Sequence, residues 1–339
     1  MEKEREIQLD VIKVMASLMV ITLHLGNIYL RSGYFIDKPV YQWIGHFWSI
    51  TMRLCVPMFV MVSGSLFFRN KEKLKLASYY KNTLKRIVAP TIIASGFYTF
   101  VTGIQQYIFS SGIKFDVLLE NIYTGNVYSH LWYMYMAIGL YLMAPILHNV
   151  YCKVNKGEFC LIGLGLTGIG VISAFLFDLP WPLLFIQYMG YFVMGRVLRE
   201  LDVRISKNYL LIIGGCIWVG VYILSVMQRI YHFYENVQLY KYLSPFTILT
   251  SWILYYLMTS CEFKRMTVSL KKHIVTLSSA NLWIYLVHQF FLDIVYHWIL
   301  RDNSVLLHPA LFIPVMSIAI YCVSFFTTRL LRRSKKGSI

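Results

Sequence analysis

Charged side chains are scarce in this chain of 339 residues. They make up 14% of it, whereas soluble globular domains have about 25%. Apolar side chains make up 58%, so few polar groups remain to cover a surface that faces water. This balance excludes a disordered chain and an ordinary cytosolic enzyme, and it predicts a protein that lies mostly in lipid.

Paired cysteines and low-complexity tracts are also missing. The six cysteines include no CxxC pair, and most of them lie in or beside apolar runs, which is typical of buried thiols. The 20 glycines and nine prolines are scattered, which excludes a collagen-like chain. We therefore expect neither a disulfide framework nor a bound metal ion.

Long apolar runs are what the sequence has instead. A membrane-spanning helix needs about 20 mostly apolar residues, and ten stretches qualify: about 9–30, 46–68, 87–108, 128–150, 159–177, 182–198, 209–229, 243–261, 275–299 and 308–328. The sequence thus predicts an all-α bundle of about ten transmembrane helices, forming a single domain over residues 1–339. No small-residue cleavage site follows the first run, so we expect it to remain as a helix.

The basic residues alternate between the two sides of these predicted helices. Lys and Arg number 32 and Asp and Glu 16, for a net charge of +16. The N-terminus and every second gap carry 24 of the basic residues, and the other gaps carry six. This asymmetry predicts that both termini are cytoplasmic. It also argues against a nucleic-acid partner, because the charge is spread over six segments rather than gathered on one face.

Two cations, Lys13 and Arg53, fall within predicted spans, where a charge is costly and indicates function. Lys13 and His24 are eleven residues apart, which places them within about 20° of one helix face and about 16 Å apart along the axis. Asp10 lies within about 40° of that face and can pair with Lys13 at i,i+3. A structural alternative is that Lys13 snorkels to the interface and His24 is a hydrogen-bonded bundle residue.

Arg53 lies at a depth similar to that of His24 if the first two predicted spans are antiparallel neighbours. In the same span, Ser63 is level with Lys13, and Gly64 permits close backbone approach to another helix or to a ligand. Plain helix packing is the more frequent explanation for such a glycine.

Three further segments carry candidate binding residues. Residues 69–90 hold seven basic side chains and one acidic one, so this loop is either a cytoplasmic anchor or an anion site that includes Lys85 and Arg86. His130 and Trp132 begin the fourth predicted span, where aromatic residues are also expected as membrane-interface residues. Tyr285 and His288 lie in the ninth span.

These stretches resemble the membrane-bound acyltransferase family 3, whose members O-acetylate bacterial surface glycans. The similarity is greatest to the type that acts on enterobacterial common antigen. It rests on Lys13 with His24 in an Arg/Lys-x10-His pattern, on residues 56–68 with Arg53 upstream, on residues 85–90, and on residues 130–133 and 281–288. Their order and spacing agree with the family over nearly the whole chain.

The resemblance implies an O-acetyltransferase of the bacterial inner membrane. The donor would be cytoplasmic acetyl-CoA, and the acceptor a hydroxyl of a cell-surface glycan or of its lipid-linked precursor. Histidine suits deprotonation of a sugar hydroxyl near neutral pH, so we expect His24 to be the general base. Asp10 and Lys13 would organise the inner end of the site, and Arg53 would steady an oxyanion or orient a substrate. We expect these further residues to contact the substrates: Ser63, Lys85, Arg86, His130, Trp132, Tyr285 and His288.

Two other classes of protein compete with the acyltransferase. Transporters, including flippases of lipid-linked sugars, also place polar residues at mid-membrane, but no inverted repeat is visible in this sequence. A purely structural membrane subunit would not need Lys13, His24 and Arg53. Besides lipid, acetyl-CoA and the glycan acceptor are the expected partners, and the sequence leaves open the oligomeric state, the identity of the acceptor and the length of the acyl group.

Overall fold

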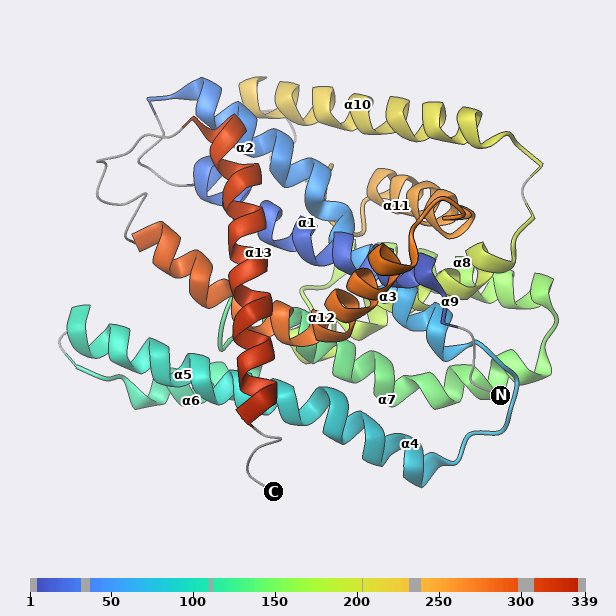
Figure 1. The fold of residues 1–339 in the computed structure, drawn as a ribbon, viewed down its shortest axis with the longest axis horizontal. Helices are drawn as coiled ribbons and strands as arrows, with labels where there is room; N and C mark the ends of the chain where they lie inside the picture. Colours follow the sequence, from blue (N-terminus) through green and yellow to red (C-terminus); the bar gives the residue numbers. More distant parts are fainter. Residues whose placement is uncertain are drawn as a thin grey trace. The chain divides into compact units, whose positions relative to one another are not determined.

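The computed structural model describes residues 5–31, 37–109, 112–202, 204–231, 239–297 and 308–334. Within these ranges the chain is helical and contains no β-strand (Figure 1). The predicted all-α membrane bundle is therefore confirmed as a fold class. The helices group into two compact units, one formed by Met1–Val62 and Leu201–Ile339 and the other by Ser63–Glu200.

The first unit contains the N-terminal and C-terminal helices. Its elements are α1 (Ile7–Arg31), α2 (Pro39–Thr51), the 3-10 turn η2 (Met52–Leu54), α3 (Cys55–Phe67) as far as Val62, α10 (Lys207–Tyr231), α11 (Pro245–Thr259), α12 (Val268–Val295) and α13 (Pro309–Ser334). Proline begins α2, α11 and α13, where its missing N–H costs nothing because the first helical N–H groups have no intrahelical acceptor.

The second unit contains the middle of the chain. Besides the end of α3, its elements are α4 (Leu76–Thr83), the π-helical turn η3 (Leu84–Val88), α5 (Ala89–Phe109), α6 (Phe115–Thr124), α7 (Trp132–Lys153), α8 (Lys156–Leu176), the 3-10 turn η4 (Trp181–Leu183) and α9 (Phe185–Glu200). A capping box of Asn155 and Glu158 fixes the start of α8.

Each of the ten predicted spans coincides with a helix over most of its length, except that the last two residues of the ninth, 298 and 299, lie outside the described residues. Seven helical stretches of the described chain are long and apolar enough to cross a membrane. Three predicted spans coincide with helices outside this set. Helices α9 and α11 have 16 and 15 residues, short of the usual 20 or so. Helix α12 has 28 residues, but polar side chains such as Asn281 and His288 interrupt its apolar sequence. The number of spans therefore stays a prediction.

The basic segment 69–90 was expected to be a loop, and this was wrong for its second half. Helix α4 begins at Leu76, and α4, η3 and α5 form one continuous helical stretch. The hydroxyl of Tyr79 donates to the carbonyl of Tyr141 on α7 and anchors this stretch, at 2.7 Å. Charged residues at exposed positions hide such a helix from a search for apolar runs.

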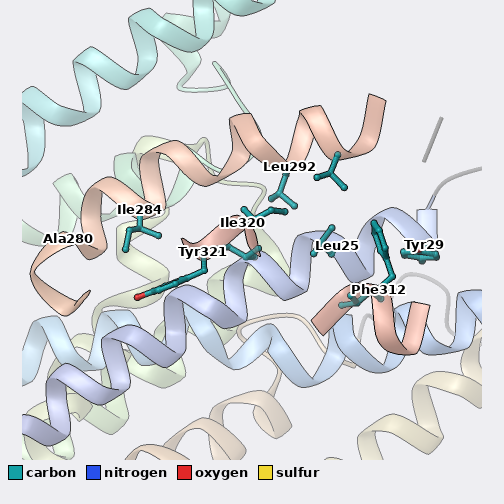
Figure 2. Close-up of a cluster of buried hydrophobic side chains, with 11 residues drawn as sticks. Leu25, Tyr29, Ala280, Ile284, Leu292, Phe312, Ile320 and Tyr321 are labelled. Atoms are coloured by element: carbon teal, nitrogen blue, oxygen red, sulfur yellow. The ribbon is translucent and has the colours of Figure 1, made fainter. Parts of the chain in front are cut away.

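In the first unit, α1 packs on α2, α12 and α13. Figure 2 shows its buried core, to which α1 contributes Leu25 and Tyr29, α12 Ile284 and Leu292, and α13 Phe312. Helices α1 and α2 approach closely at two glycines. A Cβ added to Gly26 would lie 2.9 Å from the carbonyl oxygen of Gly45. This close packing fixes α1, which carries the predicted catalytic residues, against the helix that precedes Arg53.

Candidate functional site

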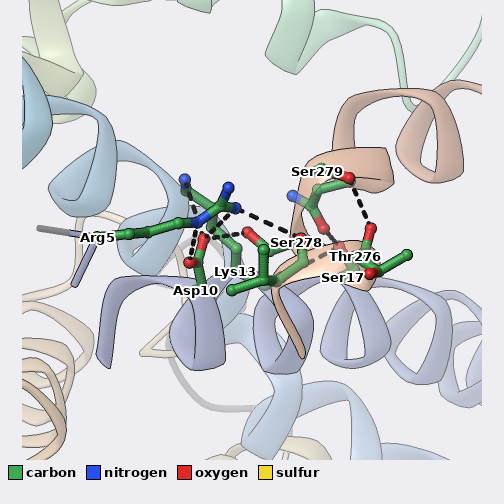
Figure 3. A network of polar contacts seen from close by, with 9 residues as sticks. Arg5, Asp10, Lys13, Ser17, Thr276, Ser278 and Ser279 are labelled. Carbon is green, nitrogen blue, oxygen red and sulfur yellow. Dashed lines mark hydrogen bonds and ion pairs between the residues drawn. The ribbon is translucent and has the colours of Figure 1, made fainter. Parts of the chain in front are cut away.

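Asp10, in the first turn of α1, is the centre of a polar network in the first unit. Its side chain is only 3% exposed. Arg5 donates two hydrogen bonds to its two carboxylate oxygens, from Nε at 2.6 Å and from Nη2 at 3.1 Å. Ser278 of α12 donates a third, at 2.5 Å. Figure 3 shows Arg5, Lys13 and Ser278 around the carboxylate, which is therefore fully satisfied despite its burial.

The predicted Asp10–Lys13 pair is present, but it is the longest contact of this network. The two charged atoms are 3.9 Å apart, and the Lys13 side chain is 26% exposed. Asp10 is engaged mainly by Arg5, whose pKa is raised above its usual value by this hydrogen-bonded carboxylate. Lys13 thus keeps hydrogen-bonding capacity for another anion.

A second polar contact fastens α1 to α12 next to this network. The hydroxyl of Ser17 forms hydrogen bonds with the side-chain oxygen of Asn281 and with the carbonyl of Lys13. Farther along α1, Thr22 donates to Ser317 of α13 at 2.9 Å. Hydrogen bonds between helices fix their register where apolar contacts alone would allow them to slide.

His24 of α1 contacts His288 of α12, with ring centroids 5.6 Å apart. His288 is completely buried, and its Nδ1 lies 2.5 Å from the carbonyl oxygen of Tyr285. A carbonyl only accepts, so Nδ1 carries the proton and Nε2 of the neutral ring has the lone pair. The predicted general base thus has a second histidine of fixed tautomer beside it, which the spacing within α1 could not reveal.

Arg53 lies in a separate cluster of the same unit. It is 9% exposed on the turn η2, and its guanidinium carbon is 5.0 Å from the ring centroid of Tyr240 and 5.4 Å from that of Tyr242. Its Nη2 donates to Ser49 at 3.4 Å, and Ser49 donates to Asn27 of α1 at 2.8 Å. The cluster is connected to α1 one turn after His24.

Ser63 and Gly64 belong to the second unit. The Ser63 hydroxyl is hydrogen-bonded to the buried hydroxyl of Tyr141. A Cβ on Gly64 would lie 1.7 Å from the carbonyl oxygen of Phe192 on α9. Of the two explanations for Gly64, the close approach of another helix is confirmed.

The remaining predicted binding residues of this unit have different surroundings. Lys85 and Arg86 are exposed on the π-helical turn η3. Pro90 lacks the N–H that would bond the carbonyl of Arg86. The N–H of the preceding Ala89 donates to the carbonyl of Leu84, five residues back, and this spacing makes η3 a π-helical turn.

His130 and Trp132 both contact tyrosine rings. His130 is fully buried, and its ring centroid is 4.8 Å from that of Tyr98. Trp132, in the first turn of α7, lies 5.9 Å from Tyr188 by the same measure. The burial of His130 differs from the position of a typical membrane-interface residue.

The structure brings together two groups of predicted site residues in the first unit: Asp10 with Lys13, and His24 with His288 and Tyr285. Sequence reasoning missed Arg5, which looked like one more cytoplasmic cation, and Ser278, which looked like a neutral residue of α12. The only sequence feature that could have indicated Arg5 is its position shortly before Asp10, an acidic residue at the start of a predicted span. Among the described residues, no three His, Cys, Asp or Glu side chains are arranged to hold a metal ion.

Asp10, Lys13 and His24 thus lie along the first helix of a helical membrane protein. Residues 6–329 match the sequence model of an acyltransferase domain. The chain therefore belongs to the membrane acyltransferase family 3 and is a multi-pass membrane protein of that family. No curated protein and no solved structure matched the chain.

Proposed function

We propose that this protein transfers an acetyl group from cytoplasmic acetyl-CoA to a hydroxyl of a cell-surface glycan or its lipid-linked precursor, in the inner membrane of a bacterium. His24 is the general base. The observation that carries the proposal is the position of His24, half-buried on α1 against His288 and on the same helix as the Asp10–Lys13 pair. Family membership supplies the reaction type, and this arrangement supplies a base beside a second histidine.

The reaction needs one base and one proton donor. The acceptor oxygen attacks the thioester carbonyl while its proton passes to His24, and a C–O bond forms. The tetrahedral intermediate then collapses, the C–S bond breaks, and the coenzyme A sulfur leaves with the proton that His24 returns. The acetyl ester and free coenzyme A are the products, and His24 ends the cycle neutral.

His288 orients the base in this scheme. Its Nδ1–H is held by the Tyr285 carbonyl, so its ring has a fixed orientation next to His24. Tyr285 itself packs against Phe59 of α3, with ring centroids 6.4 Å apart. The pair of histidines is thus supported by aromatic packing, as a catalytic base must be to stay in a productive geometry.

Lys13 binds an anionic part of the donor in this proposal. Eleven residues separate it from His24, a rise of about 16 Å, which suits a long donor such as acetyl-CoA. Arg5 and Ser278 donate hydrogen bonds to the Asp10 carboxylate, so the Lys13 ammonium is available to a phosphate. Ser63, Lys85, Arg86, His130 and Trp132 are proposed as further substrate contacts.

The test is the release of free thiol from acetyl-CoA by the purified protein in detergent. We expect the wild type to release thiol and His24→Ala to release at least about a hundredfold less, because general base catalysis typically contributes that much. His273→Ala is the matched control, because His273 is an exposed histidine whose one hydrogen bond to a described residue is with the carbonyl of Ser269 on its own helix, α12.

Equal thiol release by wild type and His24→Ala would exclude His24 as the base. If acetyl-CoA neither bound nor reacted while a labelled sugar lipid crossed proteoliposomes, the protein would be a transporter. Loss of activity in His24→Ala together with retained activity in His273→Ala would support the proposal.

A further inference from the structure

Arg53 is a buried cation whose hydrogen bonds are largely unmade. The side chain is 9% exposed, and its Nε is buried with no acceptor among the described residues. Its single hydrogen bond to a described residue is the long one to Ser49, at 3.4 Å. No ion pair joins Arg53 to a carboxylate in the described part of the chain. A guanidinium has five N–H donors and stays charged at any accessible pH.

The surrounding aromatic rings do not provide hydrogen-bond acceptors for the Arg53 guanidinium. Tyr240 and Tyr242 lie near the guanidinium, at 5.0 and 5.4 Å from their centroids, and attract it through their π-faces. A ring face compensates part of the charge, but it offers no oxygen in the guanidinium plane. Arg53 is therefore held in place by its neighbours while its donors remain available to an anion.

His46 supplies an acceptor at the same tyrosine. The Ser225 hydroxyl donates a hydrogen bond to the carbonyl of Tyr222 at 2.8 Å. Because its only proton is used there, it accepts the hydrogen bond from Nε2 of His46 at 3.0 Å. Nδ1 of His46 then has a lone pair, is buried, and meets no partner among the described residues. The His46 ring centroid is 5.5 Å from that of Tyr240, the ring that also packs on Arg53.

We propose that Arg53, Tyr240, Tyr242 and His46 form a recognition site for an oxyanion carried by the acceptor, either a phosphate or a carboxylate. This inference rests on the proposed function, because it concerns the acceptor of the same reaction. Arg53 binds the two coplanar oxygens of the anion, and His46 accepts a hydrogen bond from a neighbouring hydroxyl. The acceptor is thus an acidic sugar or a sugar phosphate rather than a neutral glycan.

The geometry favours an anion over a neutral sugar. A hydroxyl would satisfy one N–H of Arg53 and leave this buried cation without a counter-ion, which is unfavourable. A phosphate or a carboxylate compensates the charge and accepts two parallel hydrogen bonds from the planar fork.

Three amphiphiles that differ in one group test the site directly: octyl glucoside, octyl glucuronide and octyl glucosyl phosphate. We would measure their binding to the purified protein in dodecyl maltoside by calorimetry. We expect the wild type to bind a charged probe about ten to a hundred times more tightly than octyl glucoside, the effect of a charged hydrogen bond. The better of the two charged probes identifies the phosphate or the carboxylate.

Variants assign this preference to Arg53. Arg53→Gln should bind the three probes equally, and Arg53→Lys should keep part of the preference because it keeps the charge. Arg265→Gln is the matched control: it removes an exposed arginine of the same unit, in the segment between α11 and α12. It should keep the full preference.

Equal or undetectable binding of all three probes by the wild type would overturn the proposal, whether or not Arg53→Gln folds. A preference that survives in folded Arg53→Gln would overturn it too. The His24→Ala protein separates this inference from the proposed function. It should lose thiol release and keep the preference for a charged probe, so the absence of thiol release by the wild type would refute the function alone.

Discussion

Ser278 donates a hydrogen bond of 2.5 Å to Asp10, although 268 positions separate the two residues in the chain. The same carboxylate accepts two hydrogen bonds from Arg5. The segment before α1, the first turn of α1 and the first half of α12 therefore meet at one buried acid. Because α1 carries His24 and α12 carries His288, this junction also fixes the two histidines relative to one another.

The first prediction concerns the acid itself. Asp10→Asn keeps the shape of the side chain but removes the charge and turns one acceptor into a donor that faces Arg5. We expect a loss of about 1–3 kcal/mol in stability, the usual cost of disrupting a buried charged hydrogen bond. Thermal melting of the detergent-solubilised protein measures it. The exposed Asp178 provides the control Asp178→Asn, and equal melting of the two variants would contradict this role.

The second prediction is that Arg5 binds Asp10 and thereby leaves Lys13 available to acetyl-CoA. In Arg5→Ala, Lys13 becomes the nearest cation to Asp10 and is drawn towards it. We expect the KM for acetyl-CoA to rise about tenfold with little change in kcat, and Arg5→Lys to restore part of the loss. Steady-state thiol release at varied acetyl-CoA checks this, and a change in kcat alone would show that Arg5 acts elsewhere.

The same variant has a defined pH dependence. The folded pKa of Arg5 is raised, so its contribution to stability is present below the usual arginine pKa and is lost only above it. The melting difference between wild type and Arg5→Ala should therefore be equal at pH 7 and at pH 9. A difference that shrinks over this interval would mean that another group, not Arg5, provides the stabilisation.

Helix positions and the Asp10–Lys13 pair were predictable because both depend on local spacing. Apolar runs mark helices, and an i,i+3 pair needs only one helix. Ser278 and His288 could not be placed beside Asp10 and His24, because no sequence periodicity relates α1 to α12. Helix α4 was missed for a different reason, since its charged and polar residues break the apolar pattern that identifies a span.

In the Arg53 cluster, too, the local feature was predictable and the long-range contacts were not. A charge inside an apolar run was enough to single out Arg53 from the sequence. Its neighbours Tyr240 and Tyr242 lie far along the chain, in the segment between α10 and α11, and look like ordinary aromatic residues near a helix start. Only the folded unit shows that they pack on the guanidinium.

A further prediction concerns Lys13. Lys13→Arg keeps the charge and adds a planar fork suited to phosphate, so we expect acetyl-CoA use to be retained. Lys13→Met keeps the chain length and loses the charge, and we expect its affinity for acetyl-CoA to fall about tenfold or more. Direct measurement of acetyl-CoA binding distinguishes Lys13→Arg from Lys13→Met. Equal affinity of both variants for acetyl-CoA would show that Lys13 is not part of the donor site.

The role of His288 can be tested by a change that keeps one of its nitrogens. In His288→Asn the amide nitrogen can still donate to the Tyr285 carbonyl, as Nδ1 does now, but nothing replaces Nε2 beside His24. We expect folding to be retained and kcat to fall about a hundredfold, with the acetyl-CoA KM little changed. The pH profile of kcat is the decisive readout, because a purely structural role would leave its shape as in the wild type.

The last prediction concerns the packing of α3 on α9 in the second unit. Gly64 lies where an added Cβ would be 1.7 Å from the Phe192 carbonyl oxygen, far inside van der Waals contact. Backbone cannot move away as a flexible side chain can, so Gly64→Ala must separate the two helices or fail to fold. Overpacking of this kind costs about 1–3 kcal/mol, occasionally more. Neighbouring Ser63 and Ser65, with their bonds to Tyr141 and Arg199, would be displaced with the helix.

Two glycines of α8 provide the control. A Cβ on Gly165 or Gly168 meets no atom within 4 Å, and alanine is the better helix former by about 1 kcal/mol. Gly165→Ala and Gly168→Ala should therefore melt at or above the wild-type temperature, while Gly64→Ala melts well below it or is not recovered from the membrane. If Gly64→Ala were as stable as the two controls, α3 and α9 would not be in backbone contact, and the close approach inferred for Gly64 would be refuted.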